Sequence, residues 1–242
     1  MEHLPHFDDS SLSRVLCVAA HPDDLEYGAS AAVARWTAAG VSVSYLLLTA
    51  GEAGMRSHPP EEAGPLRAQE QRLACAEVGV EDLVILDLPD GLLEADHTTR
   101  RHIARRIRAV QPDLVLTQPW ELDVGWGLNH VDHRAAGLAV DDAIRDADNP
   151  WIFTELLREE NLQPWSTNWL MVAGAEPDHL IDVSGTPLRQ AISSLSAHAA
   201  YLEELSDHPD PEDMLSGMTS EMAERAADSD VQNALGVRLF PM

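Results

Sequence analysis

Between residues 14 and 146 the chain alternates short apolar runs with longer segments that suit helices. The apolar runs are short and rich in valine and leucine, as buried strands are. Strands that alternate with helices form parallel βαβ units with right-handed crossovers. The sequence therefore predicts an α/β fold, a Rossmann-like three-layer αβα sandwich with a mainly parallel sheet. The predicted strands are 14–20, 41–49, 83–88 and 114–118, and the predicted helices are 30–39, 66–78, 99–110 and 132–146.

Beyond about residue 150 this alternation weakens. Residues 169–173 and 179–183 could be two further strands, and 187–205 a helix. The acidic, proline-containing stretch 206–216 is predicted to be an exposed loop, as is 50–65 with its three glycines and three prolines. We expect a single domain over residues 1–242, with a Rossmann-like core at 14–150 and a smaller C-terminal extension at 151–242.

The chain is strongly acidic, with 41 acidic residues against 16 basic ones and a formal net charge of −25. Such a surface repels nucleic acid and anionic membranes, so neither is expected as a partner. Neutral or cationic small molecules, or a metal ion, are the expected partners. All 16 basic residues are arginines, which excludes a Schiff-base or lysine general-base mechanism.

Cysteine use and the N-terminal residues bear on location. Cys17 and Cys75 fall in segments predicted to be buried, so they are expected to be small core residues and not disulfide partners or zinc ligands. Residues 1–13 carry acids and histidines without the basic and apolar regions of a secretory signal. No apolar run approaches the roughly 18 residues that a membrane span needs. We expect a cytoplasmic protein.

A dense polar cluster, Ala20-His21-Pro22-Asp23-Asp24-Leu25-Glu26, follows the first predicted strand. Open α/β folds place their active sites at this end of their strands. His21 and Asp24 are three residues apart in a turn that opens a helix, close enough to bind one metal ion together. Imidazole and carboxylate suit zinc and other divalent first-row metals. Asp23 would then project differently and be free to act as a base.

A second cluster, His130-Val131-Asp132-His133, opens a helix shortly after the fourth predicted strand. One of its histidines could complete a His-Asp-His set with a fourth position open to water, as in catalytic zinc sites. The other, oriented by Asp132, could stabilise an oxyanion or protonate a leaving amine. The alternative for both clusters is structural: histidines near helix N-termini are common, and Asp24 could be an N-cap.

Two other enzyme classes lack their motifs. The turn after the first strand has no G-x-G-x-x-G, and its acidic residues would repel a pyrophosphate. No G-x-S-x-G follows any predicted strand, so a serine hydrolase is not supported.

Five further side chains could line a pocket. Glu52 and Arg56 lie in the loop 50–65 and could border its mouth or be solvated. Asp90 could bond a sugar hydroxyl or form an Asx-turn. Trp120 and Trp126 flank the second cluster, where each could stack on a sugar or pack the loop.

These motifs, in chain order, resemble those of the PIG-L/LmbE-like family of metal-dependent de-N-acetylases. The first cluster resembles the family's AHPDDxE motif, and the second its HPDH motif with Val131 in place of proline. The other matching segments are 48–52 after the second strand, 67–70 followed by Ala74 and 79–80, and 112–115.

The resemblance implies a zinc ion, with iron(II) as the alternative, held by His21, Asp24 and His133. It implies Asp23 as general base in the hydrolysis of a linear amide. The favoured reaction is de-N-acetylation of an amino-sugar-containing or natural-product small molecule. The site residues thus agree with those reached from the residue types alone, and the resemblance selects His133 as the ligand of the second cluster.

The resemblance also implies His130 as the electrostatic or general-acid partner, steadied by Asp132, and Arg67 as a substrate-contacting residue. We count Glu52 and Asp90 with Arg67 as candidate substrate-binding residues.

The C-terminal segment, which shapes the substrate pocket in the family, departs most from the pattern. Residues 181–183 and His198 resemble it faintly, although a helix histidine is more often structural. Arg189 stands where a lysine is usual, and Ala200-Tyr201 where Ser-Gln is usual. Three alternatives therefore stay open: an amidase for another acyl or thiol-conjugate amide, a metal-binding protein without catalysis, and an acidic interaction protein. A homo-oligomer is also an open alternative.

Overall fold

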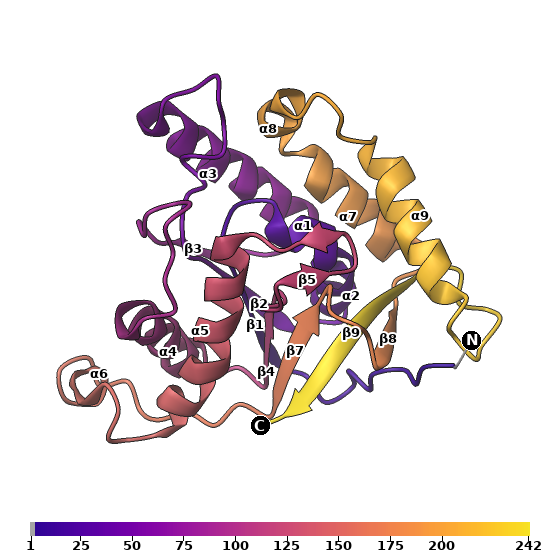
Figure 1. Cartoon of the computed structure of the whole chain (residues 1–242). Helices are drawn as coiled ribbons and strands as arrows, with labels where there is room; N and C mark the ends of the chain where they lie inside the picture. Colours follow the sequence, from indigo (N-terminus) through magenta and orange to yellow (C-terminus); the bar gives the residue numbers. More distant parts are fainter. Residues whose placement is uncertain (1–2) are drawn as a thin grey trace.

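A seven-stranded sheet in the order β3-β2-β1-β4-β7-β9-β8 forms the centre of the molecule, with helices on both of its faces (Figure 1). The computed structural model describes residues 3–242; Met1 and Glu2, part of the segment searched for a secretory signal, lie outside the described residues. Of the helices in residues 3–242, none has the length and apolar character needed to cross a membrane.

The strands of the sheet are β1 (Arg14–Ala19), β2 (Ser42–Leu47), β3 (Asp82–Ile85), β4 (Leu114–Thr117), β7 (Trp169–Ala173), β8 (His179–Asp182) and β9 (Ala234–Pro241). The short strands β5 (Asp123–Val124) and β6 (Gly127–Leu128) form a separate hairpin. The helices are α1 (Asp24–Gly28), α2 (Ser30–Ala38), α3 (Pro60–Glu77), α4 (His97–Val110), α5 (Val131–Asp148), α6 (Thr154–Arg158), α7 (Thr186–Ser196), α8 (Ala199–Glu204) and α9 (Pro211–Ala223).

The pairing of the strands confirms the predicted α/β class with a mainly parallel sheet. Strands β3, β2, β1, β4 and β7 run parallel, with Leu16 of β1 opposite Val115 of β4. Strand β9 lies between β7 and β8 and is antiparallel to both. Residues 151–242 thus supply β7, β8 and β9 to the same sheet as the strands of residues 14–150.

Alternate residues of β1 enter two separate cores, as the two-residue period of a strand requires. Val15 and Cys17 pack on one face with residues of α2 and α7, while Leu16 and Val18 pack on the other with α4 and α5. Both faces are covered, and β1 is accordingly apolar and buried from its second residue onward, as in other sheets covered on both sides. Cys17 and Cys75 are free thiols inside this core, as predicted.

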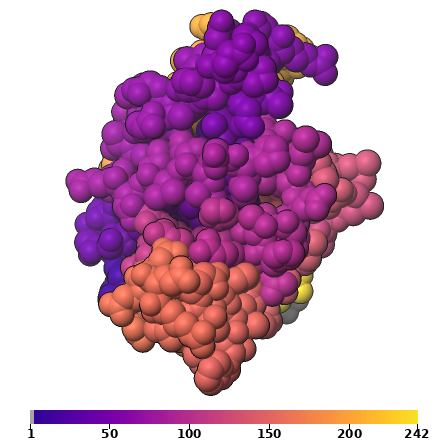
Figure 2. Space-filling model, turned by 90° about the vertical axis from the view of Figure 1, so that its left-hand side faces the viewer, coloured from indigo at the N-terminus to yellow at the C-terminus, as the bar shows by residue number. Residues whose placement is uncertain are grey.

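Helix α6 is held against α4 by ion pairs. Arg101 of α4 lies 2.7 Å from Glu155 and 3.4 Å from Glu160. Figure 2 shows this segment, in orange, packed beside the magenta surface that includes α4.

The prediction of a loop over residues 50–65 was wrong at its end, because α3 begins at Pro60. Proline is tolerated in the first turn of a helix, where its missing N–H has no partner to lose. Pro65 lies inside the helix, and it misled the sequence argument that placed the start at residue 66.

The prediction of an exposed loop over 206–216 holds for 206–210 but was wrong beyond them, because α9 starts at Pro211. Asp210 caps this helix, and its carboxylate accepts hydrogen bonds from the N–H groups of Glu212 (2.9 Å) and Asp213 (3.4 Å). The acidic residues that indicated a solvated loop therefore stabilise a helix N-terminus.

The helix predicted over 187–205 is two helices, α7 and α8, separated by Ala197 and His198. Strand β9 was not predicted, since Gly236 and Pro241 interrupt its pattern.

Candidate active site

The two sequence clusters meet at the carboxyl ends of β1 and β4. His21 lies two residues after the end of β1, α1 begins at Asp24, and His130 is the N-cap of α5. Strand β1 pairs with β2 on one side and β4 on the other, so the chain reverses its direction of winding at this point. Ligands of open α/β folds bind in the crevice at such a switch point.

Asp23 adopts a left-handed backbone conformation, with φ of 85°. Among residues with a side chain, aspartate and asparagine tolerate this region best. The two adjacent carboxylates consequently have different partners. Asp23 bonds Arg67 of α3, whereas Asp24 faces His21 and His133. Asp24 is not the N-cap of α1, because Asp23 occupies that position.

The three residues expected to hold a metal lie together. Nε2 of His133 is 3.0 Å from Oδ1 of Asp24, and Nδ1 of His21 is 3.5 Å from Oδ2 of Asp24. The ring of His130 completes the cluster, and ligand nitrogens of the three histidines lie within 4.8 Å of one another. Imidazoles beside a carboxylate suit zinc or iron(II), so the donor set fits a divalent first-row metal.

Two further carboxylates hold the other side of the His21 ring. Its Nε2 lies 2.9 Å from Oδ1 of Asp90 and 3.1 Å from Oδ2 of Asp132. Metal-binding histidines usually donate their second N–H to a carboxylate in this way, which fixes the ring. This arrangement leaves Nδ1 of His21 directed to Asp24, as a metal ligand requires.

The carboxylates around His21 favour a positive charge in the cluster. Burial lowers the pKa of His21, but Asp24, Asp132 and Asp90 outweigh burial and raise the pKa to about 12. Burial would raise the pKa of Asp24, yet His21 and His133 hold that pKa far below its usual range. The cluster therefore stabilises a cation, which supports the fit of a metal ion.

Asp23 is buried against Arg67. Burial raises the pKa of Asp23 to about 7, and the Arg67 guanidinium opposes this rise. Nη2 of Arg67 donates to Oδ1 of Asp23 at 2.9 Å and to the carbonyl of Pro22, and Nη1 donates to the carbonyl of Gly51. The guanidinium also stacks 3.9 Å above the ring of Tyr201. Arg67, expected to contact substrate, is 2% exposed and holds Asp23; direct contact with a substrate stays a prediction.

The carboxylate of Asp132 supports His21 and not the ring of His130. Besides His21, it accepts hydrogen bonds from the N–H groups of Gly91 (2.6 Å) and Leu93 (3.1 Å). Its link with His130 is through the backbone: the N–H of Asp132 donates to Nδ1 of His130 at 3.3 Å. The sequence predicted that the Asp132 carboxylate would orient His130, but in the structure it contacts His21.

Glu52 and Asp90 tie two loops to the site. Oε1 of Glu52 accepts from the N–H of Asp90 at 2.9 Å, and Oδ2 of Asp90 accepts from the N–H of Ala53 at 2.7 Å. Contact of either residue with a substrate stays a prediction. Arg56 is exposed in the same loop.

Sequence reasoning missed a buried polar network behind Asp23. Oε1 of Gln71 accepts from the N–H of Asp23 at 3.1 Å, and Nε2 of Gln71 donates to Glu26 at 3.0 Å. Ser194 of α7 also donates to Glu26, and His198, fully buried, lies 3.6 Å from it. Gln71 follows Arg67 by four residues on α3, so both side chains lie on one face of the helix. This spacing could have identified Gln71 as part of the network.

The two tryptophans of the loop have different environments. Trp120 packs on the α4–α5 core beside Phe240. Trp126 is 64% exposed and lies against Gly174, where an added Cβ would be 2.7 Å from its ring.

Fold and site together define an α/β protein with a candidate divalent-metal centre at the carboxyl edge of its sheet. Residues 16–144, more than half of the chain, match the family described as PIG-L: GlcNAc-PI de-N-acetylase. The chain belongs to this family, which confirms the resemblance found in its motifs.

Related sequences are deacetylases. The diacetylchitobiose deacetylase of Thermococcus kodakarensis is 32% identical over 144 residues, which cover 58% of this chain and 52% of that protein. The match thus spans about half the length of that relative. The 1D-myo-inositol 2-acetamido-2-deoxy-alpha-D-glucopyranoside deacetylase of Streptomyces scabiei is 29% identical over 252 residues, covering 78% of this chain and 76% of that protein.

Solved structures show the same fold. The N,N'-diacetylchitobiose deacetylase from Pyrococcus horikoshii superimposes with a TM-score of 0.82 at 22% identity, covering 96% of this chain and 85% of that one. GalB, the 4-carboxy-2-hydroxymuconate hydratase from Pseudomonas putida, superimposes with a TM-score of 0.76 at 18% identity, covering 95% of this chain and 97% of that one. Because proteins of different activity share it, the fold alone does not give the reaction.

Proposed function

We propose that this protein is a metal-dependent amidase that removes an N-acetyl group from an amino-sugar-containing or natural-product small molecule. The observation that carries the proposal is Asp23, a buried carboxylate that adjoins the metal-binding set without belonging to it. A site that only bound metal would have no use for this carboxylate. Zinc is the proposed metal, with iron(II) as the alternative, and His21, Asp24 and His133 are the proposed ligands.

A bound metal would polarise the amide carbonyl and make water a stronger acid. Asp23 accepts the proton of the attacking water. Its Oδ1 is bonded to Arg67, so Oδ2 is the oxygen available for this proton. A general base held in this way contributes to the rate only when it is deprotonated.

His130 stabilises the negative charge that develops on the amide oxygen. Burial, followed by the charge of His21, lowers the pKa of His130, which keeps this ring neutral. Nδ1 of His130 accepts the N–H of Asp132, so the proton of the neutral ring is assigned to Nε2. Nε2–H can then donate a hydrogen bond to the oxyanion. The leaving amine takes the proton that Asp23 removed from the water.

The reaction is tested with metal-loaded protein and N-acetylglucosamine derivatives, by measuring the release of primary amine. The chain contains no lysine, so amine-reactive dyes have almost no background from the protein. We expect amine release that a chelator abolishes and added zinc or iron(II) restores. The absence of amine release from every acetamide tested, with one metal ion bound per chain, would contradict the proposal.

Replacing Arg67 by methionine is expected to move the acid limb of the kcat/KM profile to higher pH. Arg67 lowers the pKa of Asp23, so its removal lets that pKa rise, and a higher pH is then needed to deprotonate the base. Arg67→Lys, which keeps the charge, should return the limb towards its original position. The exposed Arg72→Met on the same helix is the matched control. An unmoved limb in Arg67→Met would show that this arginine does not act through Asp23.

A further inference from the structure

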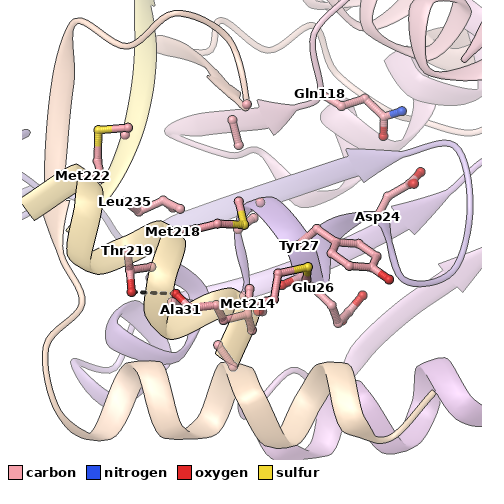
Figure 3. Close-up of a pocket in the computed structure, with 18 of the residues that line it drawn as sticks. Asp24, Glu26, Tyr27, Ala31, Gln118, Met214, Met218, Thr219, Met222 and Leu235 are labelled. Carbon is pink, nitrogen blue, oxygen red and sulfur yellow. Dashed lines mark hydrogen bonds between the residues drawn. The ribbon is translucent and has the colours of Figure 1, made fainter. Parts of the chain in front are cut away.

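A cavity of about 500 Å³ adjoins the candidate site. Asp24 and His133 lie at one end of it, and from there it extends between α9 on one side and α1, α2 and α7 on the other. Figure 3 shows Asp24 and Gln118 at one end, and Met222 and Leu235 at the opposite end. A group bonded to an amide at the metal centre could therefore continue directly into this cavity.

The wall of the cavity is apolar over most of its length. Its apolar lining comes from α2, α7, α9 and the strands β7 and β9, and includes Ala31, Ala173, Leu188, Met214, Met218 and Leu235. Three hydroxyl groups of the wall are bonded within the protein. Ser30 and Thr219 donate to backbone carbonyls, and the hydroxyl of Tyr27 bonds His208 at 2.7 Å. A sugar ring in this cavity would leave its hydroxyl groups without partners, which is costly.

Helix α9 presents methionines to the cavity at four-residue intervals: Met214, Met218 and Met222. Methionine is flexible and polarisable, so it adapts to apolar ligands of varied shape. Met218 is 51% exposed although it lines the cavity, so the packing of α9 leaves this space open.

The end next to the metal centre is more polar than the rest. Gln118 lies there, and its Nε2 is buried without a hydrogen-bond partner among the described residues. Polar groups at one end and an apolar channel beyond match an N-acyl amide, whose amide is polar and whose chain is not. The space far exceeds an acetyl methyl group and is comparable to that of pockets for drug-sized ligands, roughly 300–1,000 Å³.

We propose that the acyl group removed by this protein is an alkanoyl chain of about the size of octanoyl, which lies in the cavity between α7 and α9. The amine part of the substrate remains on the opposite side of the centre, near Asp23, Asp90 and the loop of Glu52. This inference rests on the proposed amidase function and extends the acyl group from acetyl to a longer alkanoyl chain, with acetyl amides expected to be slower substrates.

The test compares kcat/KM for glucosamine carrying N-acetyl, N-butanoyl or N-octanoyl groups. We expect the octanoyl derivative to exceed the acetyl derivative roughly tenfold or more, since each buried methylene adds to binding. Met218→Trp fills the cavity and should lower the octanoyl-to-acetyl ratio by roughly tenfold or more. Leu73→Trp is the matched control, because Leu73 is also 51% exposed on a helix but lies outside the cavity. It should leave the ratio unchanged.

Each contrary outcome has a separate meaning. Preference for acetyl, or an unchanged ratio in Met218→Trp, overturns the acyl-chain proposal and leaves the amidase function standing. Preference for N-acetyl-octylamine over N-octanoyl glucosamine overturns it too, because the cavity would then hold the amine side. If no amide is hydrolysed, the amidase function fails. Calorimetric titration with N-octanoyl glucosamine then shows whether the cavity binds the acyl chain. Saturable binding that Met218→Trp weakens supports the chain site, and no binding overturns it.

Discussion

Turnover is expected to fall roughly 100- to 10,000-fold when Asp23 is replaced by asparagine, while the protein keeps its metal ion. Asparagine retains the shape of the side chain but cannot accept the proton of water. It also tolerates the left-handed backbone at this position, with φ of 85°, better than alanine does. Asparagine is therefore the cleaner variant, although alanine should give a similar loss.

The measurement combines kcat on the best amide with the metal content of the same sample by plasma mass spectrometry. Asp87→Asn makes the same chemical change at an exposed position and should leave both values unchanged. Full turnover in Asp23→Asn would remove Asp23 as the base. Loss of the metal in that variant would instead place Asp23 among the ligands.

Replacing His133 by alanine is expected to abolish tight metal binding. Loss of a group that only supports a ligand weakens metal affinity roughly 10- to 100-fold, and loss of a ligand should cost more. His133 is the only proposed ligand contributed by α5, and its Nε2 lies 3.0 Å from Asp24. Without it, the cluster at the end of β1 keeps one imidazole and one carboxylate of the proposed set.

This loss is measured as metal per chain after dialysis against a weak chelator, for wild type and variant prepared together. His97→Ala, at the exposed start of α4, controls for the removal of a histidine. Equal and full occupancy in wild type and His133→Ala would exclude His133 from the ligand set. Absence of metal from wild type even after incubation with zinc would contradict the metal centre as a whole.

Much of the central fold could be predicted from local pattern. The parallel strands β1, β2 and β4 are buried along almost their whole length, and apolar runs of that kind are conspicuous in a sequence. The meeting of the two clusters followed from the same argument, because parallel neighbours bring their carboxyl ends to one edge.

The pairing of side chains within the site could not be predicted in the same way. Asp132 stands two residues from His130 in the sequence, which suggested that the two side chains interact. Residues two apart at the start of a helix face different directions, and the Asp132 carboxylate instead meets His21, 111 positions away. Arg67 is a similar case, since a buried arginine is rare and depends on partners supplied by distant residues.

The cavity could not be predicted from local sequence patterns, for a related reason. It depends on α9, whose first half fell in a predicted loop, and on β9, which was not predicted. The apolar stripe of α9 has only three methionines and a leucine among polar residues, and the first turn is acidic. Only the contact of this stripe with the sheet and with α7 shows that it faces inward.

The position of β9 between β7 and β8 also bears on how the molecule is made. During synthesis β7 and β8 are made some fifty to seventy residues before β9. Until β9 is made, these two strands lack the strand that pairs with both of them. Pairings between segments so far apart in the chain form slowly, and exposed strand edges are prone to wrong association in the meantime. Nascent chains from which residues 234–241 have not yet emerged therefore lack one wall of the cavity, so the cavity forms only after β9 has been synthesised.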